Sequence, residues 1–212
     1  QEFGADILFI TGAYITSRHL ANQKYLDSNG YSVTVMKDRE AQPADAIDKD
    51  LLIISESVYS RKVNTTFRNL PVPIIVSEPW LFDDMGLTGQ LHTVDFGRSK
   101  RQFAVTITNP NHPLAASLDG TVSISYRRRT IGWGVPSASA MTIASLENEP
   151  DKYAIFAYNK GDEMVELTAP EKRIGIFLRR NTATRLTAEG WALFDAAVSW
   201  ALESAPPKQD QA

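Results

Sequence analysis

Two glutamates, each preceded by a serine, stand at the ends of apolar runs that have the composition of buried β-strands. The runs span residues 50–56 and 72–78, and their last residues are Glu56 and Glu78. The carboxyl ends of parallel strands form the crevice in which doubly wound domains bind ligands. If the two strands are neighbours in one sheet, the serine–glutamate pairs lie side by side at that edge. The residues concerned are Ser55, Glu56, Ser77 and Glu78.

Paired carboxylates at a ligand-binding edge can support several kinds of chemistry. They can hold a cation, accept hydrogen bonds from the hydroxyl groups of a polyol, or share a proton as an acid/base pair. The alternative is structural, because a serine or glutamate after a strand can cap the next helix by accepting backbone N–H bonds. Both interpretations stay open for Glu56 and Glu78. Trp80, two residues after Glu78, completes the candidate ligand-binding residues in this region.

Nucleophilic and zinc-dependent chemistry find less support in the sequence. As a nucleophile Ser77 would need a histidine and an acid beside it, and the small residues of a G-x-S-x-G elbow are missing around it. The three histidines, His19, His92 and His112, are spaced too widely for a zinc site. His112 lies between prolines in NPNHPLAA, where it either hydrogen-bonds across a rigid turn or takes part in catalysis. We expect no metal and no cofactor.

Three consecutive arginines occur in the segment YRRRTIGWG. On a strand, Arg127 and Arg129 share one face, and Trp133 follows shortly after them. A planar guanidinium beside an indole suits a carboxylate, a phosphate or a sugar ring. A row of arginines also protects an exposed edge strand, and the sequence is equally compatible with this second interpretation. Arg179 and Arg180 add positive charge after a later apolar run.

The first half of the chain has the pattern of a parallel sheet. Four apolar runs follow one another, and a helix with Ser17 as its N-cap separates the first two and ends at Asn29-Gly30. Nearly continuous apolar runs indicate strands that are buried on both faces by the connections between them. We expect these strands at residues 6–12, 31–36, 50–56 and 72–78.

The second half alternates apolar and polar residues more regularly. This pattern predicts strands partly outside the parallel sheet at 90–96, 102–108 and 121–127, and further strands at 140–146, 153–158 and 173–178. Thr187 caps a closing helix that carries Trp191, Phe194, Val198 and Leu202 on one face. The predicted fold class is α/β: a three-layer α/β/α, flavodoxin-like domain whose mostly parallel sheet has an additional β excursion.

Length and composition exclude several functional classes. The 212 residues fit one domain over 1–204 with a linker-like polar tail at 205–212. A net charge of −3 gives no footprint for nucleic acid, and no apolar run reaches the roughly 18 residues that span a bilayer. Cysteine is absent, which excludes thiolate nucleophiles and disulfides. We expect part of a larger protein, extracellular or periplasmic, with a cytoplasmic location and a cloning origin for residues 1–3 as alternatives.

The layout resembles the class I glutamine amidotransferase-like superfamily, in particular its ThuA-like (trehalose utilisation) branch. The likeness rests on four segments: ILFITGAY, PIIVSEPW, NPNHPLAASL with its His-Pro pair, and LTAEGWALFDAAVSWAL. Glutaminase members place a cysteine at a sharp strand-to-helix elbow flanked by glycines. In this chain the corresponding region reads Ser77-Glu78-Pro79-Trp80, without cysteine or glycine. The resemblance therefore implies a member that does not hydrolyse glutamine by the mechanism of the family.

Three functional classes follow as expectations from the residues and the resemblance. The first is a non-glutaminase domain that binds a small polar or carbohydrate-like ligand, as an accessory domain linked to carbohydrate metabolism. The second is an enzyme acting on a sugar or another polyhydroxy substrate, with Glu56 and Glu78 as the reacting groups. The third is a module that contacts other domains of a larger exported protein. A ligand seated against Glu56 and Glu78 distinguishes the first two classes from the third.

Overall fold

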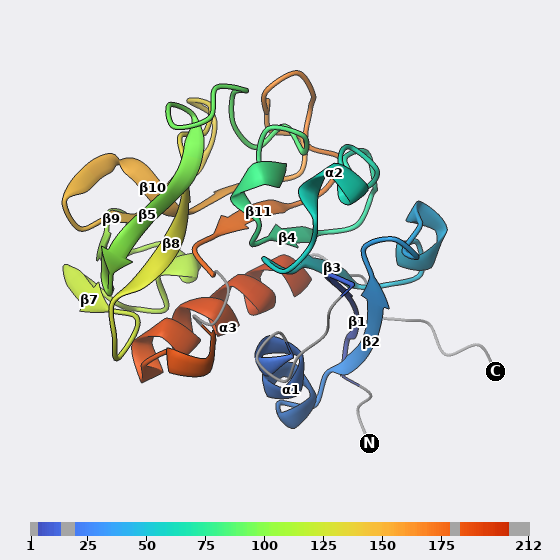
Figure 1. Cartoon of the computed structure of the whole chain (residues 1–212), viewed down its shortest axis with the longest axis horizontal. Coiled ribbons are helices and arrows are strands. Elements are labelled where there is room, and N and C mark those ends of the chain that lie inside the picture. The colour runs from blue at the N-terminus through green and yellow to red at the C-terminus, as the bar shows by residue number, and fades with distance from the viewer. Residues whose placement is uncertain (1–3, 14–19, 179–182, 204–212) are drawn as a thin grey trace.

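A mixed β-sheet forms the centre of the computed structural model, which describes residues 4–13, 20–178 and 183–203 (Figure 1). Its main path runs in the order β2-β1-β3-β4-β11-β10-β9-β6-β7. The first five strands are parallel, and the last four continue the sheet antiparallel. The strands are β1 (Asp6–Thr11), β2 (Ser32–Lys37), β3 (Leu51–Ile54), β4 (Ile74–Val76), β6 (Ala104–Ile107), β7 (Thr121–Ser123), β9 (Met141–Leu146), β10 (Glu149–Tyr158) and β11 (Arg173–Ile176).

Two further strands form an antiparallel ribbon off this path. Among the strands of the described residues, β5 (Phe96–Gln102) pairs with β8 (Arg129–Gly134) alone, and β8 joins β10 where Gly134 pairs with Tyr153. The N–H of Gly132 also donates to the carbonyl oxygen of Phe177, 3.3 Å away, just beyond the end of β11. The ribbon therefore reaches the carboxyl edge of the parallel strands. The ribbon itself was not predicted. The strands expected outside the parallel sheet at 102–108 and 121–127 correspond to β6 and β7, which extend the main path antiparallel.

Helices cover the two faces of the sheet unequally. α1 (Ala21–Ser28) and α3 (Ala188–Leu202) lie together on one face, below the sheet in Figure 1. The opposite face is covered by shorter elements and by the loops between them. These are α2 (Ser60–Val63), η1 (Pro43–Ala46) and η2 (Pro79–Leu81). The arrangement confirms the predicted α/β, flavodoxin-like fold class, with crossovers that are much less helical than is usual.

The apolar runs are explained by burial on both faces of the parallel strands. In β3, Leu51 and Ile53 pack on the side of α1 and α3, while Leu52 and Ile54 pack on the other side. All four are fully buried. Strands of this kind read as continuous apolar runs because neither face meets water.

The closing helix agrees with its prediction in most respects. The Thr187 hydroxyl accepts a hydrogen bond from the N–H of Gly190 at 3.1 Å, which caps α3. Phe194 and Val198 are buried, whereas Trp191 and Leu202 are only half-buried at the margin of the core. Ser17, the expected N-cap of the first helix, lies outside the described residues.

Two predicted strands need correction. Residues 90–96 do not form a strand: the Asp95 carboxylate accepts the N–H of Leu91 at 2.9 Å and closes a turn, so β5 starts only at Phe96. The alternation of apolar and polar residues in QLHTVDF thus belongs to an exposed turn. The strand expected at 121–127 ends at Ser123, and a separate strand begins at Arg129. Within the described residues, no helix has the length and apolar character needed to cross a membrane.

Candidate functional site at the carboxyl edge of the parallel strands

The two serine–glutamate pairs are neighbours, as the sequence predicts. β3 and β4 pair in parallel with Ile54 opposite Val76, so each serine–glutamate pair leaves its strand at the same level. The N–H of Ser77 donates to the carbonyl oxygen of Ile54 at 2.9 Å and extends the pairing by one residue. Glu56 is 8% exposed and Glu78 is 6% exposed. The fold therefore holds two largely buried carboxylates on adjacent strand ends.

A hydroxyl network surrounds Glu56. The Ser55 hydroxyl donates to Glu56 Oε2 at 2.8 Å and lies 3.1 Å from the Ser57 hydroxyl. Ser57 Oγ in turn lies 2.8 Å from Thr11 Oγ1 and accepts the N–H of Gly12 at 3.1 Å. These contacts connect the ends of β1 and β3 and position the Glu56 carboxylate. Thr11 and Ser57 were not among the residues that we expected at the site.

Glu56 does not occupy a helix-capping position, in contrast to the structural interpretation. The next helix, α2, has Tyr59 as its N-cap, and no side chain caps it there. The N–H of Tyr59 donates to Asp38 Oδ2 at 2.7 Å.

Glu78 does cap the element that follows it. Its Oε1 accepts the N–H of Trp80 at 3.3 Å, and η2 begins at Pro79. The backbone of Glu78 is ordinary extended chain, with φ −91° and ψ 109°. A nucleophile elbow requires a sharp, strained turn with an exposed side chain. This strand end is relaxed and leads into a single turn of 3₁₀ helix, so it is not built as such an elbow.

The Ser77 hydroxyl is an unsatisfied polar group at this edge. Ser77 is 1% exposed, and its Oγ has no hydrogen-bond partner among the described residues. A buried hydroxyl without a partner is unfavourable, because its hydrogen bonds to water are lost without replacement. A ligand with a polar group at this position would supply the missing bond.

Trp80 brings residues to the site that the sequence did not indicate. The Arg98 guanidinium lies over the indole of Trp80, 5.0 Å from the ring centroid, and the His92 ring is 5.4 Å away. Arg98 belongs to β5, so this contact depends on the ribbon folding back toward η2. His92 is exposed in the turn before β5. The cation and the two rings form a polar and aromatic rim next to Glu78.

β8 contains Arg129 and Trp133, and Arg127 lies just before it; the three side chains have different environments. Arg127 is exposed, and Arg129 starts the strand partly buried. Trp133 is 3% exposed, and the Lys152 ammonium lies 4.5 Å from its ring centroid. Its indole Nε1 has no partner among the described residues. Trp133 thus points from β8 into the core, whereas Arg127 is on the surface and Arg129 is partly buried.

His112 is not brought together with the two glutamates. It lies beside Met141, with Nε2 3.1 Å from Sδ, and Met141 pairs with Ala157 next to Tyr158. Tyr158 pairs with Arg173 at the amino end of β11, which places His112 at the opposite edge of the sheet. Its Nδ1 accepts the N–H of Leu114 at 3.2 Å and caps a short turn, η3 (Pro113–Ala115). Burial lowers the pKa of His112.

Two aspartates beyond η2 have perturbed acidities. Burial raises the pKa of Asp83, whose Oδ1 has no partner among the described residues. Burial and the charge of Asp83 raise the pKa of Asp84, and Arg68 opposes this shift. In the part of the chain that the structure describes, no cluster of three His, Asp or Glu side chains could hold a metal ion. His19, Arg179 and Arg180 lie outside that part.

Comparison with solved structures identifies the fold. A protein assigned as part of a GMP synthase from Thermoplasma acidophilum superposes with a TM-score of 0.60 at 9% identity, covering 93% of this chain and 94% of its own. A chain of PurLQS from Thermotoga maritima superposes with a TM-score of 0.56 at 12% identity, covering 93% of this chain and 99% of its own. A glutamine amidotransferase from Thermotoga maritima superposes with a TM-score of 0.55 at 9% identity, covering 94% of this chain and 99% of its own. No family model and no curated protein sequence matches the chain.

These neighbours define the class of fold: it is that of the class I glutamine amidotransferases, as the sequence motifs predict. At such low identity the likeness concerns the backbone and does not extend to activity. The chain has no cysteine at the end of β4 or anywhere else in its 212 residues. The ThuA-like assignment stays a prediction from the sequence motifs.

Proposed function

We propose that this chain is a ligand-binding domain that uses the glutamine amidotransferase fold without glutaminase chemistry. The observation that carries the proposal is the relaxed end of β4. There the backbone of Glu78 is extended, and its carboxylate caps η2. A strand end used in this way lacks the strained turn that would present a nucleophile. The site is therefore suited to hold a ligand rather than to form a covalent intermediate with it.

The ligand that fits this edge is small, polar and rich in hydroxyl groups. Glu56 is an acceptor held by the Ser55 hydroxyl, and Ser77 Oγ is a buried hydroxyl without a described partner. Hydroxyl donors of a sugar or polyol match carboxylate acceptors, and aromatic and cationic side chains suit its rings and acidic substituents. The resemblance to the ThuA-like branch supports the same choice. We place the domain accordingly as an accessory unit in carbohydrate metabolism.

A second candidate is an enzyme that acts on a polyhydroxy substrate. The observation in its favour is the parallel register of β3 and β4, which places the two glutamates on neighbouring strand ends. Two carboxylates in different environments can divide the roles of acid and base. Here Glu78 is engaged with the N–H of Trp80, whereas Glu56 lies in the hydroxyl network, so the environments do differ.

The decisive experiment combines an activity assay with a binding screen. Purified protein incubated with glutamine should release no ammonia above the blank. Calorimetry with a panel of sugars, sugar acids and polyols should identify a ligand, and Glu56→Gln should weaken its binding by about tenfold or more, since a charge-assisted hydrogen bond is lost. The exposed Glu147→Gln provides the matched control and should leave affinity unchanged. Ammonia release that persists in repeated preparations would overturn the proposal.

The Glu78→Gln variant separates the binding function from the enzymatic one. As a capping residue, Glu78 contributes about 0.5 to 2 kcal/mol to stability, and glutamine keeps an acceptor oxygen for the N–H of Trp80. A binding domain should therefore tolerate the change with a small loss of stability. If the domain instead turns over a sugar from the panel, the same change should reduce the rate by about a hundredfold or more, as expected for a general acid or base.

A further inference from the structure

Two short basic runs, far apart in the sequence, meet at one end of the β5–β8 ribbon. β5 and β8 pair antiparallel with Gln102 opposite Arg129, so Lys100 and Arg101, in the register shift just before Gln102, lie beside the start of β8. Arg127 and Arg128 lead into β8 at the same point. We call the resulting surface the cationic ribbon end. It consists of Lys100, Arg101, Arg127, Arg128 and Arg129. The sequence showed only its second half, because the pairing of the two strands was not predicted.

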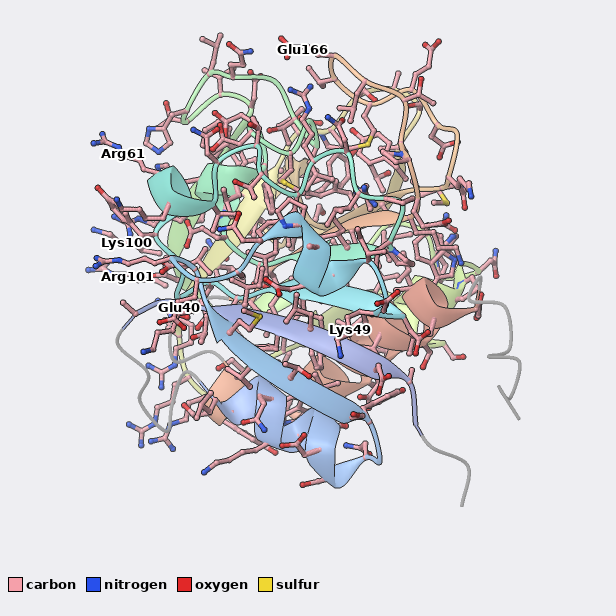
Figure 2. All side chains as sticks on the ribbon, turned by 90° about the vertical axis from the view of Figure 1, so that its right-hand side faces the viewer. Glu40, Lys49, Arg61, Lys100, Arg101 and Glu166 are labelled. Atoms are coloured by element: carbon pink, nitrogen blue, oxygen red, sulfur yellow. The ribbon has the colours of Figure 1, made fainter. Side chains whose placement is uncertain are left out.

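The charge of the cationic ribbon end is not neutralised by neighbouring carboxylates. The ion pairs among the described residues join Lys37 to Glu40, Arg68 to Glu166, Lys152 to Glu149 and Lys160 to Glu171, and none involves a cation of this surface. Figure 2 shows Lys100 and Arg101 projecting from the side of the molecule on which Arg61 also projects. Glu40 lies on that side too, where its charge is compensated by Lys37 at 3.6 Å.

The backbone presents these cations outward at a point of strain. The register of the ribbon shifts between Ser99 and Gln102, and Arg101 has a φ of 62°, in the left-handed region that side chains other than glycine rarely adopt. Strained conformations of this kind persist where the surrounding structure maintains them, and they concentrate at functional surfaces. The Nε atom of Arg129 is also buried without a hydrogen-bond partner among the described residues.

Aromatic side chains flank the cations. Tyr126 is 75% exposed directly before Arg127, and Phe103 is 37% exposed directly after β5. The carbonyl oxygen of Phe103 accepts the N–H of Ser125 at 3.2 Å, so the two aromatic residues belong to neighbouring segments. The N–H of Tyr126 donates to the carbonyl oxygen of Arg185 at 3.0 Å, which adds another exposed cation. Ring-bearing ligands with acidic groups match such a surface.

We propose that the cationic ribbon end binds an acidic saccharide chain, one whose sugar rings carry carboxylate or sulfate groups. Guanidinium groups recognise planar carboxylates and sulfates with paired hydrogen bonds, and exposed aromatic rings pack on sugar rings. The surface is local in a chain that has 25 carboxylates against 22 lysines and arginines. The net charge of −3 disfavours a ligand of high and continuous charge density, such as duplex nucleic acid, more than it disfavours a short saccharide of lower charge density.

The simplest alternative is that the cations only protect an edge strand, since β5 has a strand partner on one side alone in the part of the chain that the structure describes. That role requires charge on β5 itself. It does not account for Arg127 and Arg128, which precede β8, nor for the exposed Tyr126 beside them. The proposal does not depend on Glu56 or Glu78, so its test is independent of the proposed function.

The test is a calorimetric titration of the purified protein with galacturonate oligomers at low salt. Neutral maltooligosaccharides, polyglutamate and a single-stranded oligonucleotide serve as comparison probes. We expect binding to the galacturonate oligomers that weakens steeply with added salt. The Arg127→Ala, Arg128→Ala double variant should weaken it by about tenfold or more, since two charge-assisted contacts are lost.

A matched control removes two cations elsewhere: Lys24→Ala on α1 with Lys49→Ala before β3 should change the affinity by no more than about twofold. Unchanged affinity in the Arg127, Arg128 variant would overturn the proposal, as would the absence of binding to every anion tested. Binding of polyglutamate or the oligonucleotide as tight as that of the saccharide would overturn the assignment of the ligand class. Glu56→Gln should leave binding of the galacturonate oligomers unchanged, so the two proposed binding sites are tested separately.

Discussion

Tyr25 on α1 donates a hydrogen bond of 2.6 Å to the Asp195 carboxylate on α3, and its ring stacks on Trp191 with centroids 3.9 Å apart. The contact connects two helices that are far apart in the sequence on the same face of the sheet. Burial, and after it the bond to Asp195, raise the pKa of Tyr25 to about 12. The folded state therefore favours the neutral phenol more strongly than the unfolded chain does.

The first prediction concerns stability at alkaline pH. A raised tyrosine pKa stabilises the fold fully below the ordinary value of about 10, and this contribution disappears as the pH rises to about 12. Tyr25→Phe keeps the stacking but removes the hydrogen bond, at a cost of about 0.5 to 1.5 kcal/mol near neutrality. Urea denaturation across the alkaline range should show a smaller loss of stability in this variant. Tyr126→Phe, at an exposed tyrosine, is the control and should behave as wild type.

The second prediction concerns mild acid. His112 Nδ1 accepts the N–H of Leu114, which only an unprotonated Nδ1 can do, and burial lowers its pKa. Because the folded state binds a proton less readily than the unfolded chain, stability is retained above the ordinary value near 6.5 and declines as the pH falls below it. His112→Asn supplies a capping oxygen that does not titrate. Denaturation midpoints should therefore vary less between neutral and mildly acidic pH in this variant than in wild type.

The third prediction tests a buried cation. Arg173 is fully buried and donates to the carbonyl oxygens of Leu70 at 2.6 Å and Val72 at 2.8 Å, among others. Removing the guanidinium leaves buried carbonyl groups without donors, so Arg173→Met should cost about 3 to 5 kcal/mol. Chemical denaturation measures the loss. The exposed Arg39→Met should change stability by less than about 0.5 kcal/mol, and an equally small effect at Arg173 would contradict this account.

The fourth prediction tests close packing around a ring. A Cβ added to Gly175 would lie 2.5 Å from Phe156 Cζ, and one added to Gly134 would lie 2.8 Å from the same atom. Gly175→Ala should therefore destabilise the fold by about 1 to 3 kcal/mol through overpacking. Phe156→Leu introduced together with it should recover part of this loss, because the smaller side chain makes room for the methyl group. Additive losses in the double variant would show that the ring is not the obstacle.

The parallel half of the fold could be predicted from the sequence because its signal is local. Residues such as Leu52 and Ile53 are buried on opposite faces of one strand, so each apolar run identifies its strand without knowledge of its partners. The adjacency of Glu56 and Glu78 then followed from the usual order of such sheets. The prediction of a strand at 90–96 was wrong because this segment forms a turn. The turn depends on the hydrogen bond from the N–H of Leu91 to the Asp95 carboxylate, which the alternation of residue types does not reveal.

The rest of the site depends on long-range pairing that composition does not encode. Arg98 reaches Trp80 only because β5 pairs with a strand that begins at Arg129. Thr11 joins the hydroxyl network through Ser57, 46 positions away in the sequence. A single sequence contains no periodicity that would identify either contact.

The position of β11 has a consequence for synthesis of the protein. It is the last strand to be translated among those described, yet it lies between β4 and β10 in the middle of the sheet. Arg173, its first residue, bonds to Val72, 101 positions earlier in the chain. The nascent polypeptide must therefore leave one apolar edge of β4 without its neighbour while most of the chain emerges from the ribosome, and the core closes only after β11 has followed. Such late closure favours chaperone contact during synthesis and makes a product that terminates before β11 prone to aggregate.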